Sequence, residues 1–429
     1  MGGIERGRKT VLVTDSSRGS AVAVIRSLGR AGYRVIAVDS DPRSLGFRSR
    51  FTHKSCVVPS AKESAQEFVA ALQRIVQDDG VDLVIPVTDL AIQPLAAARQ
   101  SFAAKTRLAM ADDEPLRMVT DKDRTVELAA SLGIPVPSTR CVHTLEEGLA
   151  AAEEWGWPLV LKPRASHKLL ERDTGMESFQ VTYAENPEDL RQKLEQLQGR
   201  CTVLLQRYCR GNGIGIELLM SRGRPLAAFA HRRRREIPLT GGASSYRESI
   251  PLDPQLFAWS VRLLAAIGWT GLAMVEFKVG PERKELMEVN GRIWGSLPLA
   301  VASGMDFPAL LARLLLEGED SVPRLLENDY RIGLRCRDLQ RDALWIAAVL
   351  AQKKRYAFFP LPSRMRALRA LLGWLNPRRR SDLLVWDDPL PGLLELPRLV
   401  PRLREKARHA RSSARNWEMS PNIPRGVSS

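Results

Sequence analysis

Two strands and the turn between them are predicted by one stretch of the sequence, Ala273-Met274-Val275-Glu276-Phe277-Lys278-Val279-Gly280-Pro281-Glu282-Arg283-Lys284-Glu285-Leu286-Met287-Glu288-Val289-Asn290. Apolar and polar residues alternate on both sides of Gly280-Pro281, so the two halves should pair as an antiparallel hairpin. Glu288 and Asn290, two residues apart, share one face of the second strand, and Glu276 lies on one face of the first. If these faces coincide, two carboxylates and an amide oxygen converge, which is a ligand set suited to Mg²⁺.

The charges in this hairpin leave two interpretations open. Two carboxylates among apolar strand residues would repel each other and destabilise the fold if buried, and a cation would remove that repulsion. The alternative is a solvated strand face, which nearby Lys278, Lys284 and Glu285 would also suit. The rest of the sequence has to decide between a metal site and a surface.

Length and composition indicate a globular protein of two or three domains. The chain has 429 residues, 44% hydrophobic and 26% charged, which is ordinary for a soluble protein. Its five cysteines form no C-x-x-C pair, which argues against a disulfide framework or a structural zinc site. We find no signal-peptide pattern and no apolar window long enough to span a membrane, so the sequence predicts a cytoplasmic protein.

The positive charge is concentrated near the C-terminus. The chain has a formal net charge of +15, and residues 321–429 hold 22 Lys and Arg against 10 Asp and Glu. The first 320 residues are therefore nearly neutral. The excess charge belongs to the C-terminal segment and not to the hairpin.

Residues 10–110 predict a parallel α/β layer. We expect strands at Val11–Thr14, Arg34–Asp39 and Val81–Pro86, and helices at Ala21–Ala31 and Phe68–Gln77. The loop from Asp15 to Ser20 precedes the first helix, where free backbone N–H groups could hold an anion. It lacks G-x-G-x-x-G spacing, so a scaffold role is favoured and Asp15, Ser16 and Asp89 are only weak substrate-side candidates.

Residues 111–290 predict an α+β unit whose strands end in polar residues. We expect helices ending near Leu132 and at Glu146–Trp155, Glu188–Gln198 and Leu256–Ile267. We expect strands at Pro158–Pro163, Ser178–Thr182, Val203–Arg207, Ile216–Met220, Pro225–Arg232, Ala273–Val279 and Lys284–Val289.

Six short motifs in this part of the chain resemble, in order and spacing, those of the ATP-grasp superfamily. They are Asp121-Lys122, Gly133-Ile134-Pro135-Val136-Pro137, Leu159-Val160-Leu161-Lys162-Pro163, Leu204-Leu205-Gln206-Arg207-Tyr208, Val275-Glu276-Phe277 and Met287-Glu288-Val289-Asn290-Gly291-Arg292. The resemblance covers about residues 10–315 and is closest to the carbamoyl-phosphate synthase large chain, biotin carboxylase and predicted carboxylate–amine ligases. Each motif is weak alone, and six in order are specific.

This resemblance implies an α/β and α+β architecture in three parts. Residues 1–112 would form a Rossmann-like pre-ATP-grasp domain, and residues 113–320 a two-subdomain ATP-grasp fold with the ATP and metal cleft. Residues 321–429 would form a basic, mainly helical extension rich in Trp and Arg, with an end expected to be disordered.

The resemblance also implies roles for individual residues. Lys122 and Lys162 would contact ATP phosphates, and the segment of Gln206, Arg207 and Tyr208 would read adenine through main-chain groups. Arg207 stands where an acidic residue is common, so no carboxylate contact is implied there. The metal ligands would be Glu276, Glu288 and Asn290, around two Mg²⁺ ions or Mn²⁺ in their place. Arg292 would face the transferred phosphoryl group or the acyl phosphate.

A second departure from the family pattern follows Lys162-Pro163. The family often has a Gly-rich loop that covers the phosphates, whereas here the first glycine is Gly175. Side chains of Arg164, Ser166 or His167 would have to take the place of backbone N–H groups.

Four consecutive arginines, Arg232 to Arg235, are predicted to lie in one strand, with two on each face. One pair, Arg232 and Arg234, is a candidate to bind a substrate carboxylate in the cleft, helped by the Gly241-Gly242 loop. The alternative is a solvated charge run or a nucleic-acid patch.

The C-terminal segment contains one distinctive helical pattern. Apolar residues recur at helical spacing, with arginines between them: Met365, Leu368, Leu371, Leu372 and Leu375 alternate with Arg364, Arg366 and Arg369. A helix on an anionic membrane would have this pattern. A helix packed on the protein with a basic outer face would have it as well, and that interpretation is favoured.

The sequence therefore predicts an ATP- and Mg²⁺-dependent, ADP-forming enzyme that joins a small-molecule carboxylate to an amine through an acyl phosphate. The alternatives are a bicarbonate-activating carboxylase-type enzyme, a kinase-like enzyme, and a nucleotide-binding module that docks on a membrane or nucleic acid. Peripheral membrane contact through residues 321–429 stays open, and no specific nucleic-acid partner is expected. The oligomeric state is also open, with a homodimer among the alternatives.

Overall fold

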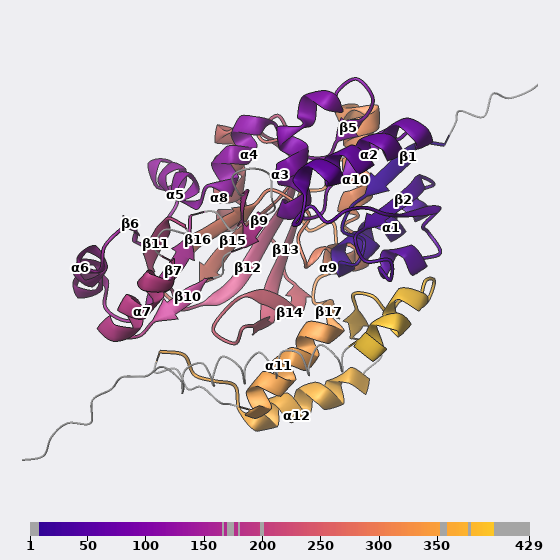
Figure 1. Cartoon of the computed structure of the whole chain (residues 1–429). Helices are drawn as coiled ribbons and strands as arrows, with labels where there is room; N and C mark the ends of the chain where they lie inside the picture. The colour runs from indigo at the N-terminus through magenta and orange to yellow at the C-terminus, as the bar shows by residue number, and fades with distance from the viewer. Residues whose placement is uncertain are drawn as a thin grey trace, which may run out of the picture.

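The N-terminal part is a parallel five-stranded sheet in the order β3-β2-β1-β4-β5 (Figure 1). The computed structural model describes residues 8–164, 167–169, 176–178, 181–197, 201–351, 358–375 and 379–398. The elements of this part are β1 (Thr10–Val13), α1 (Gly19–Arg30), β2 (Arg34–Asp39), η1 (Gly46–Arg48), β3 (Lys54–Val57), α2 (Ala65–Asp79), β4 (Leu83–Ile85), α3 (Asp89–Ala97), η2 (Arg99–Ser101) and β5 (Arg107–Leu108).

Apolar strands explain why this sheet is covered on both faces. In β1, Val11 and Val13 pack with α1 on one side, while Leu12 packs with Phe68 and Leu72 of α2 on the other. Continuous apolar runs of this kind are typical of parallel sheets. The prediction of a Rossmann-like α/β layer is confirmed.

A small antiparallel sheet, β10-β7-β11-β6, follows, and α6 and α7 cover it. Thr144 caps α6 through a capping box with Glu147, which fixes the start of that helix. The elements are α4 (Asp113–Thr120), α5 (Lys122–Ser131), β6 (Thr139–Val142), α6 (Leu145–Trp155), β7 (Leu159–Pro163), β8 (His167–Leu169), β9 (Met176–Ser178), β10 (Thr182–Ala184), α7 (Pro187–Leu197) and β11 (Val203–Arg207). Of the single strand expected at Ser178–Thr182, residues 179–180 lie outside the described residues; Ser178 belongs to β9, Val181 is not in a strand, and Thr182 begins β10.

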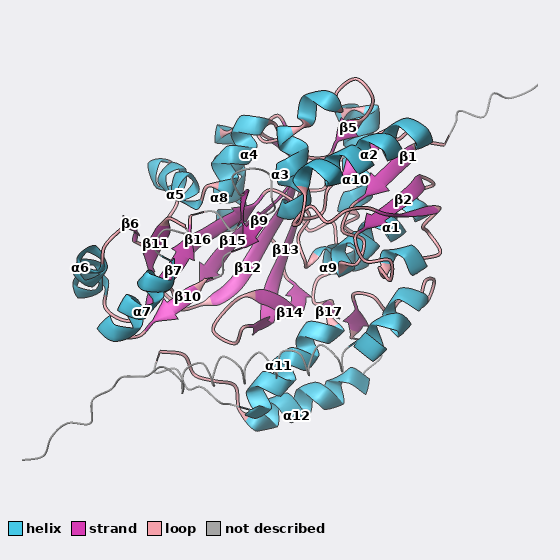
Figure 2. Cartoon of the chain, in the orientation of Figure 1, coloured by secondary structure: helices cyan, strands magenta, loops and turns pink. Residues whose placement is uncertain are grey.

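The largest sheet has seven strands in the order β16-β15-β12-β13-β14-β17-β18 (Figure 2). The predicted hairpin is confirmed, since β15 and β16 pair antiparallel. The elements are β12 (Asn212–Ser221), β13 (Arg224–Ile237), β14 (Ala243–Ser249), α8 (Pro254–Ala266), β15 (Gly271–Val279), β16 (Lys284–Asn290), α9 (Leu297–Ser303), α10 (Phe307–Glu317) and η3 (Glu319–Ser321).

The C-terminal extension adds both strands and helices to this body. Its elements are β17 (Arg335–Arg337), α11 (Leu339–Ala351), α12 (Arg364–Leu372), η4 (Gly373–Leu375) and β18 (Arg380–Ser381). β17 pairs with β14, and β18 pairs with β17, so the extension completes the large sheet and is not purely helical. The expected disordered end lies outside the described residues.

Helix α12 does not use its large apolar residues to pack on the protein. Its buried residues are Ala367 and Ala370, which pack beside Trp345, Ile346 and Val349 of α11. The small alanine face allows close approach of the two helices, and the Met and Leu side chains are left on the outer side. The favoured prediction, a helix packed on the protein with a basic outer face, is confirmed in that α12 packs on α11 and its arginines are exposed, but the apolar residues that suggested the packing are not the ones that are buried.

A buried ion pair ties the end of the extension to α1. Arg26 Nε lies 2.8 Å from Asp388 Oδ2, and the two side chains are 3% and 2% exposed. Arg26 also donates to the carbonyl oxygens of Asp382, Leu383 and Asp388. The Asp387-Asp388-Pro389 turn therefore docks on the N-terminal domain.

Among the described residues, no single helix is long and apolar enough to cross a membrane. The bent pair α9 and α10 passes the test of length and composition together. Leu297, Leu299 and Phe307 of this pair are fully buried in the protein core.

Candidate functional site

The hairpin brings the predicted metal ligands together. Glu276 on β15 stands opposite Glu288 on β16, and Asn290 stands opposite Met274. A register shift follows Glu276, so the strands bulge at this point. The other face of the hairpin packs into the core through Val275, Phe277 and other apolar residues. The pleat thus turns the polar side chains to the face opposite this core.

Asn290 links the two carboxylates directly. Its Nδ2 donates to Glu276 Oε1 at 3.1 Å and to Glu288 Oε1 at 3.2 Å. Arg292 Nη2 donates to Asn290 Oδ1 at 3.0 Å. Arg292 Nε also donates to Asp89 Oδ2 at 2.7 Å, so a residue of the N-terminal domain holds this arginine beside the cluster.

The arginine of the run that contacts the cluster is Arg233. Its guanidinium forms ion pairs with Glu276 and Glu236. Arg232 and Arg234, the predicted pair, instead lie on the opposite face, where both bind Glu248 at 3.0 and 2.8 Å. Strand alternation shows which arginines share a face, but it does not show which pair faces Glu276, and this is why Arg233 was missed.

Burial and nearby charges shift the pKa values of Glu276 and Glu288 in opposite directions. Burial raises the pKa of Glu276 to about 7, although Arg233 opposes the shift. Burial also acts on Glu288, but the combined charges of Lys122, Lys162 and Arg233 lower the pKa of that carboxyl. Burial lowers the pKa of Lys162 to about 8, and Glu288 opposes this. Lys122 and Lys162 therefore belong electrostatically to the same cluster as Glu288.

The donor set fits a hard divalent cation. Asn290 Nδ2 donates hydrogen bonds to Glu276 and Glu288, and the Arg233 guanidinium supplies positive charge to Glu276. A bound cation would also neutralise these carboxylates. Among the described residues there is no group of three His, Cys, Asp or Glu side chains that could hold a metal. Two carboxylates and one amide suit Mg²⁺, which takes its remaining ligands from water and nucleotide phosphates.

The segment predicted to read adenine lies at the end of β11, an inner strand of the small sheet. Gln206 is 2% exposed, and its Nε2 donates to Thr139 Oγ1 at 2.9 Å. Its Oε1 has no hydrogen-bond partner among the residues that the structure describes, whereas its main chain lies in a strand that pairs with β6 and β7 on its two sides. Arg207 forms an ion pair with the buried Glu285 of β16. This pair neutralises the arginine that departs from the family pattern.

Tyr208 belongs to an aromatic cluster that includes the C-terminal extension. Its ring centroid lies 5.0 Å from that of Phe358 and 6.0 Å from that of Tyr183. Tyr183 also donates to the carbonyl oxygen of Thr240, in the loop between β13 and β14. Nothing in the local sequence signals the approach of Phe358, which follows from tertiary packing alone.

The segment after Lys162 is described only in part. Arg164 pairs with Asp121, the residue that caps α5, with Nη2 to Oδ2 at 2.9 Å. Arg164 thus has a structural partner next to Lys122. Ser166 and the side chain of His167 lie outside the described residues, and so does Gly175.

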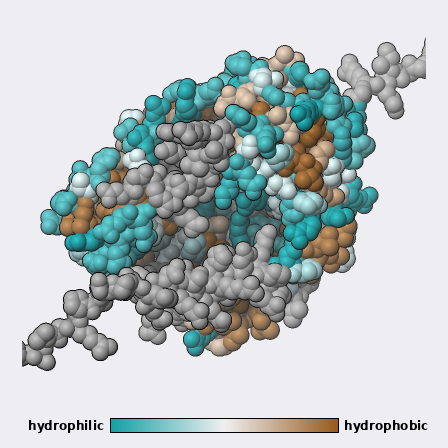
Figure 3. Space-filling view, in the orientation of Figure 1, coloured by the Kyte–Doolittle hydropathy of each residue, from teal (hydrophilic) through white to brown (hydrophobic). Residues whose placement is uncertain are grey.

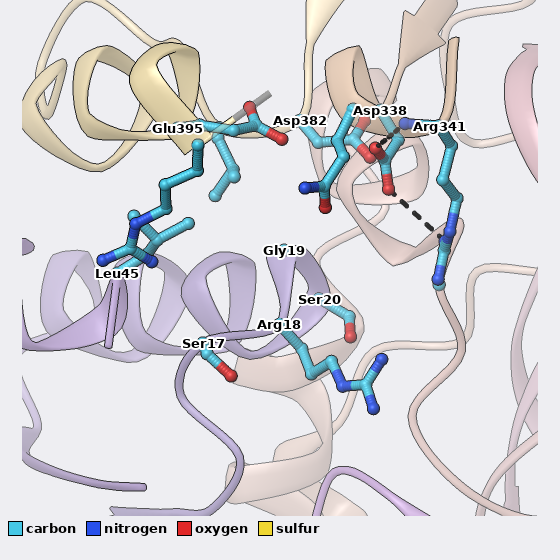
Figure 4. Close-up of a pocket in the computed structure, with 13 residues that line it drawn as sticks. Ser17, Arg18, Gly19, Ser20, Leu45, Asp338, Arg341, Asp382 and Glu395 are labelled. Atoms are coloured by element: carbon cyan, nitrogen blue, oxygen red, sulfur yellow. Dashed lines mark hydrogen bonds and ion pairs between the residues drawn. The ribbon is translucent and has the colours of Figure 1, made fainter. Parts of the chain in front are cut away.

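A cavity of about 320 Å³ lies between α1 and the C-terminal extension. Figure 4 shows Asp338, Asp382 and Glu395 on one side of it, and Ser17 and Arg18 with the start of α1 on the other. Gly295, three residues after Arg292, also lines it. Part of the loop predicted as a weak substrate candidate therefore faces a cavity.

The other weak candidates have partners within the protein. Asp15 accepts hydrogen bonds from Thr14 and Thr88, and Ser16 bonds to Ser44. Neither lines the cavity. Asp89 is the residue that holds Arg292.

Comparisons with known proteins show which family and which fold this chain resembles. A family described as "ATP-grasp in the biosynthetic pathway with Ter operon" matches residues 200–334. The chain is 26% identical over 315 residues to the carbamoyl phosphate synthase large chain of Thermus thermophilus, covering 70% of this chain and 28% of that protein. It is 22% identical to the C-terminal section of the same enzyme from Methanopyrus kandleri, covering 72% and 56%. The chain thus spans between about a quarter and about a half of the length of these relatives.

Solved structures show the same fold at low identity. The biotin carboxylase domain of Hydrogenobacter thermophilus 2-oxoglutarate carboxylase, solved with MgADP and bicarbonate, has a TM-score of 0.58 and 19% identity, covering 76% of this chain and 73% of that one. L-amino acid ligase from Bacillus licheniformis has a TM-score of 0.57 and 15% identity, covering 73% and 77%. Residues 200–334 therefore match an ATP-grasp family, and the chain has the fold of these solved structures.

Proposed function

We propose that this protein is an ATP-dependent carboxylate–amine ligase that forms ADP and a C–N bond. The observation that carries the proposal is the single cluster of Glu276, Glu288, Asn290 and Arg292, beside Lys122 and Lys162. Acidic and basic groups are brought to one place by three separate parts of the chain. A solvated strand face would not require this arrangement.

The residues divide into a metal end and a phosphate end. Glu276, Glu288 and Asn290 would hold Mg²⁺, which supplies charge neutralisation to nucleotide phosphates. Lys122 and Lys162 carry flexible ammonium groups suited to the β- and γ-phosphates. Main-chain groups of Gln206 to Tyr208 would receive adenine.

Activation is needed because a carboxylate is a poor acyl donor. In the proposed reaction a carboxylate oxygen attacks the γ-phosphorus and ADP leaves, so the acid becomes an acyl phosphate. The amine nitrogen then attacks the acyl carbon, phosphate leaves, and the nitrogen loses a proton. Arg292, which Asp89 holds beside the cluster, and Arg233, which contacts Glu276, would stabilise negative charge on the phosphoryl oxygens.

Acid-dependent ADP release tests this proposal. We would screen pairs of acids and amines for ADP formation, and then compare Glu288→Gln with Glu282→Gln. Glu282 lies exposed in the turn of the same hairpin. The Glu282→Gln variant therefore measures the effect of replacing a carboxylate by an amide outside the cluster. We expect Glu288→Gln to lose at least about a hundredfold in turnover, the scale of a lost group that stabilises transition-state charge. Undiminished turnover in Glu288→Gln would remove the metal assignment.

Transfer of label distinguishes ligation from bicarbonate activation. With an acid labelled by ¹⁸O in its carboxyl group, ligation through an acyl phosphate moves one label into phosphate. ADP release that depends on bicarbonate and leaves the label in the acid would favour the carboxylase-type alternative.

A further inference from the structure

Helix α12 carries its large apolar side chains on the outside of the protein. Met365, Leu368, Leu371 and Leu372 are 58%, 44%, 49% and 68% exposed. Figure 3 shows hydrophobic residues at the lower edge of the molecule, where Figure 1 places α12. A helix that only packed on the protein would bury these residues, because each is stabilised by leaving water.

The same outer face carries three arginines. Arg364, Arg366 and Arg369 are exposed, and within the described part of the chain none of them has an ion-pair partner. Three exposed arginines elsewhere, Arg117, Arg191 and Arg224, each pair with a glutamate. The outer face of α12 is therefore both apolar and cationic without compensation.

The inner side of α12 holds it in a fixed place. Ala367 and Ala370 are buried against α11, and Ser363 caps the first turn by accepting from Arg366 N. Trp374, just beyond the helix, donates to Asp342 Oδ2 at 3.0 Å. The outer face is thus presented by an anchored helix.

The combination of exposed apolar side chains and arginines on α12 favours one kind of binding partner over the others. A second copy would bring its own uncompensated arginines against these, and the like charges would repel. Nucleic acid would satisfy the arginines through phosphates but leave the Met and Leu side chains in water. An anionic lipid surface takes both, with arginines at the headgroups and the apolar side chains at the acyl boundary.

We infer that the outer face of α12 docks this protein on an anionic membrane surface. The helix lies in the plane of the interface with Met365, Leu368, Leu371 and Leu372 toward the lipid. The basic residues of the C-terminal segment, with 22 Lys and Arg in residues 321–429, add attraction of the same sign. The inference is independent of the proposed chemistry, because no residue of the cluster takes part.

Cosedimentation of the full chain with vesicles tests the inference. One set of vesicles is pure phosphatidylcholine, and the other also contains phosphatidylserine. We expect binding only to the anionic set, with salt weakening it. In an Arg364→Gln, Arg366→Gln, Arg369→Gln variant, binding should fall by about fivefold per arginine, or about a hundredfold in total. A Met365→Ser, Leu368→Ser, Leu372→Ser variant should lose about tenfold or more at unchanged charge.

A matched variant tests whether the position of the three arginines on α12 matters, and not only their total charge. Arg117→Gln, Arg191→Gln, Arg224→Gln removes the same three charges from exposed positions elsewhere, and its binding should stay within about twofold of the wild type. Circular dichroism melting of each variant checks that the fold persists. The inference is overturned if the wild type does not bind anionic vesicles, or if the apolar variant binds as well as the wild type. It is also overturned if the face instead mediates self-association or binding to duplex DNA without lipid.

Discussion

Replacing Asp388 with alanine should loosen the end of the C-terminal extension far more than replacing its neighbour Asp387. Asp388 Oδ2 accepts from Arg26 Nε at 2.8 Å and from Ser49 Oγ at 2.7 Å, and Oδ1 accepts from Arg50 N at 2.9 Å. The alanine variant leaves a guanidinium that is 3% exposed without its counter-charge. Breaking a buried pair in this way costs about 3–5 kcal/mol.

The lower end of that range is expected here. Arg26 keeps three carbonyl acceptors on the docked turn after the carboxylate is lost. We therefore expect about 3 kcal/mol, which raises the population of the opened segment by about 150-fold. Asp387 pairs with Arg30 at the surface, with side chains 48% and 39% exposed, and its loss should cost about 1 kcal/mol or less.

Hydrogen exchange of the amides in residues 382–396 measures this opening. Asp388→Ala should accelerate exchange there by about two orders of magnitude, and Asp387→Ala by about fivefold or less. A variant with Arg26→Leu and Asp388→Leu should lie closer to the wild type, because no buried charge is left alone. Equal acceleration by the two aspartate variants would refute the assignment of Asp388 as the anchor.

Three other substitutions probe separate features. Arg233→Ala should lower acid-dependent ADP release by about tenfold or more, because Arg233 contacts Glu276. Arg234→Ala, whose arginine pairs with Glu248 instead, should change it by less than about threefold. Equal losses in the two variants would contradict the placement of Arg233 at the cluster. Phe358→Ala should raise the KM for ATP about threefold to tenfold with kcat nearly unchanged. The reason is that the Phe358 ring packs on Tyr208, which belongs to the proposed adenine segment. A change in kcat alone would argue against a role of this contact in ATP binding. Gly215→Ala should destabilise the protein by about 1–3 kcal/mol in urea unfolding, because the added methyl group would overlap the buried ring of His231; unchanged stability would show that the ring can move.

The hairpin shows how far the sequence alone could go. Strand alternation and the Gly280-Pro281 turn place Glu276, Glu288 and Asn290 on one face, and the structure pairs Glu276 with Glu288 across the strands. The parallel sheet of the first domain could also be predicted from the sequence, because its strands are continuous apolar runs between helical patterns. Both rest on local periodicity.

Features that depend on distant contacts were not predictable. The choice of Arg233 over Arg232 and Arg234 depends on which side of β13 the cleft lies, and bulges near Arg235 obscure the register further. The outward apolar face of α12 follows from the closeness of α11 to Ala367 and Ala370. The pairing of Arg207 with Glu285 joins residues 78 positions apart. Tertiary packing decides each case.

Calorimetric titration of ATP with and without Mg²⁺ tests the central claim most directly. The claim is that Glu276, Glu288 and Asn290 form the metal end of a nucleotide site. Wild type and Glu282→Gln should bind ATP tightly only with Mg²⁺, and Glu288→Gln should lose about tenfold or more of that Mg²⁺-dependent gain. Equal Mg²⁺-dependent binding by Glu288→Gln and the wild type would contradict the account.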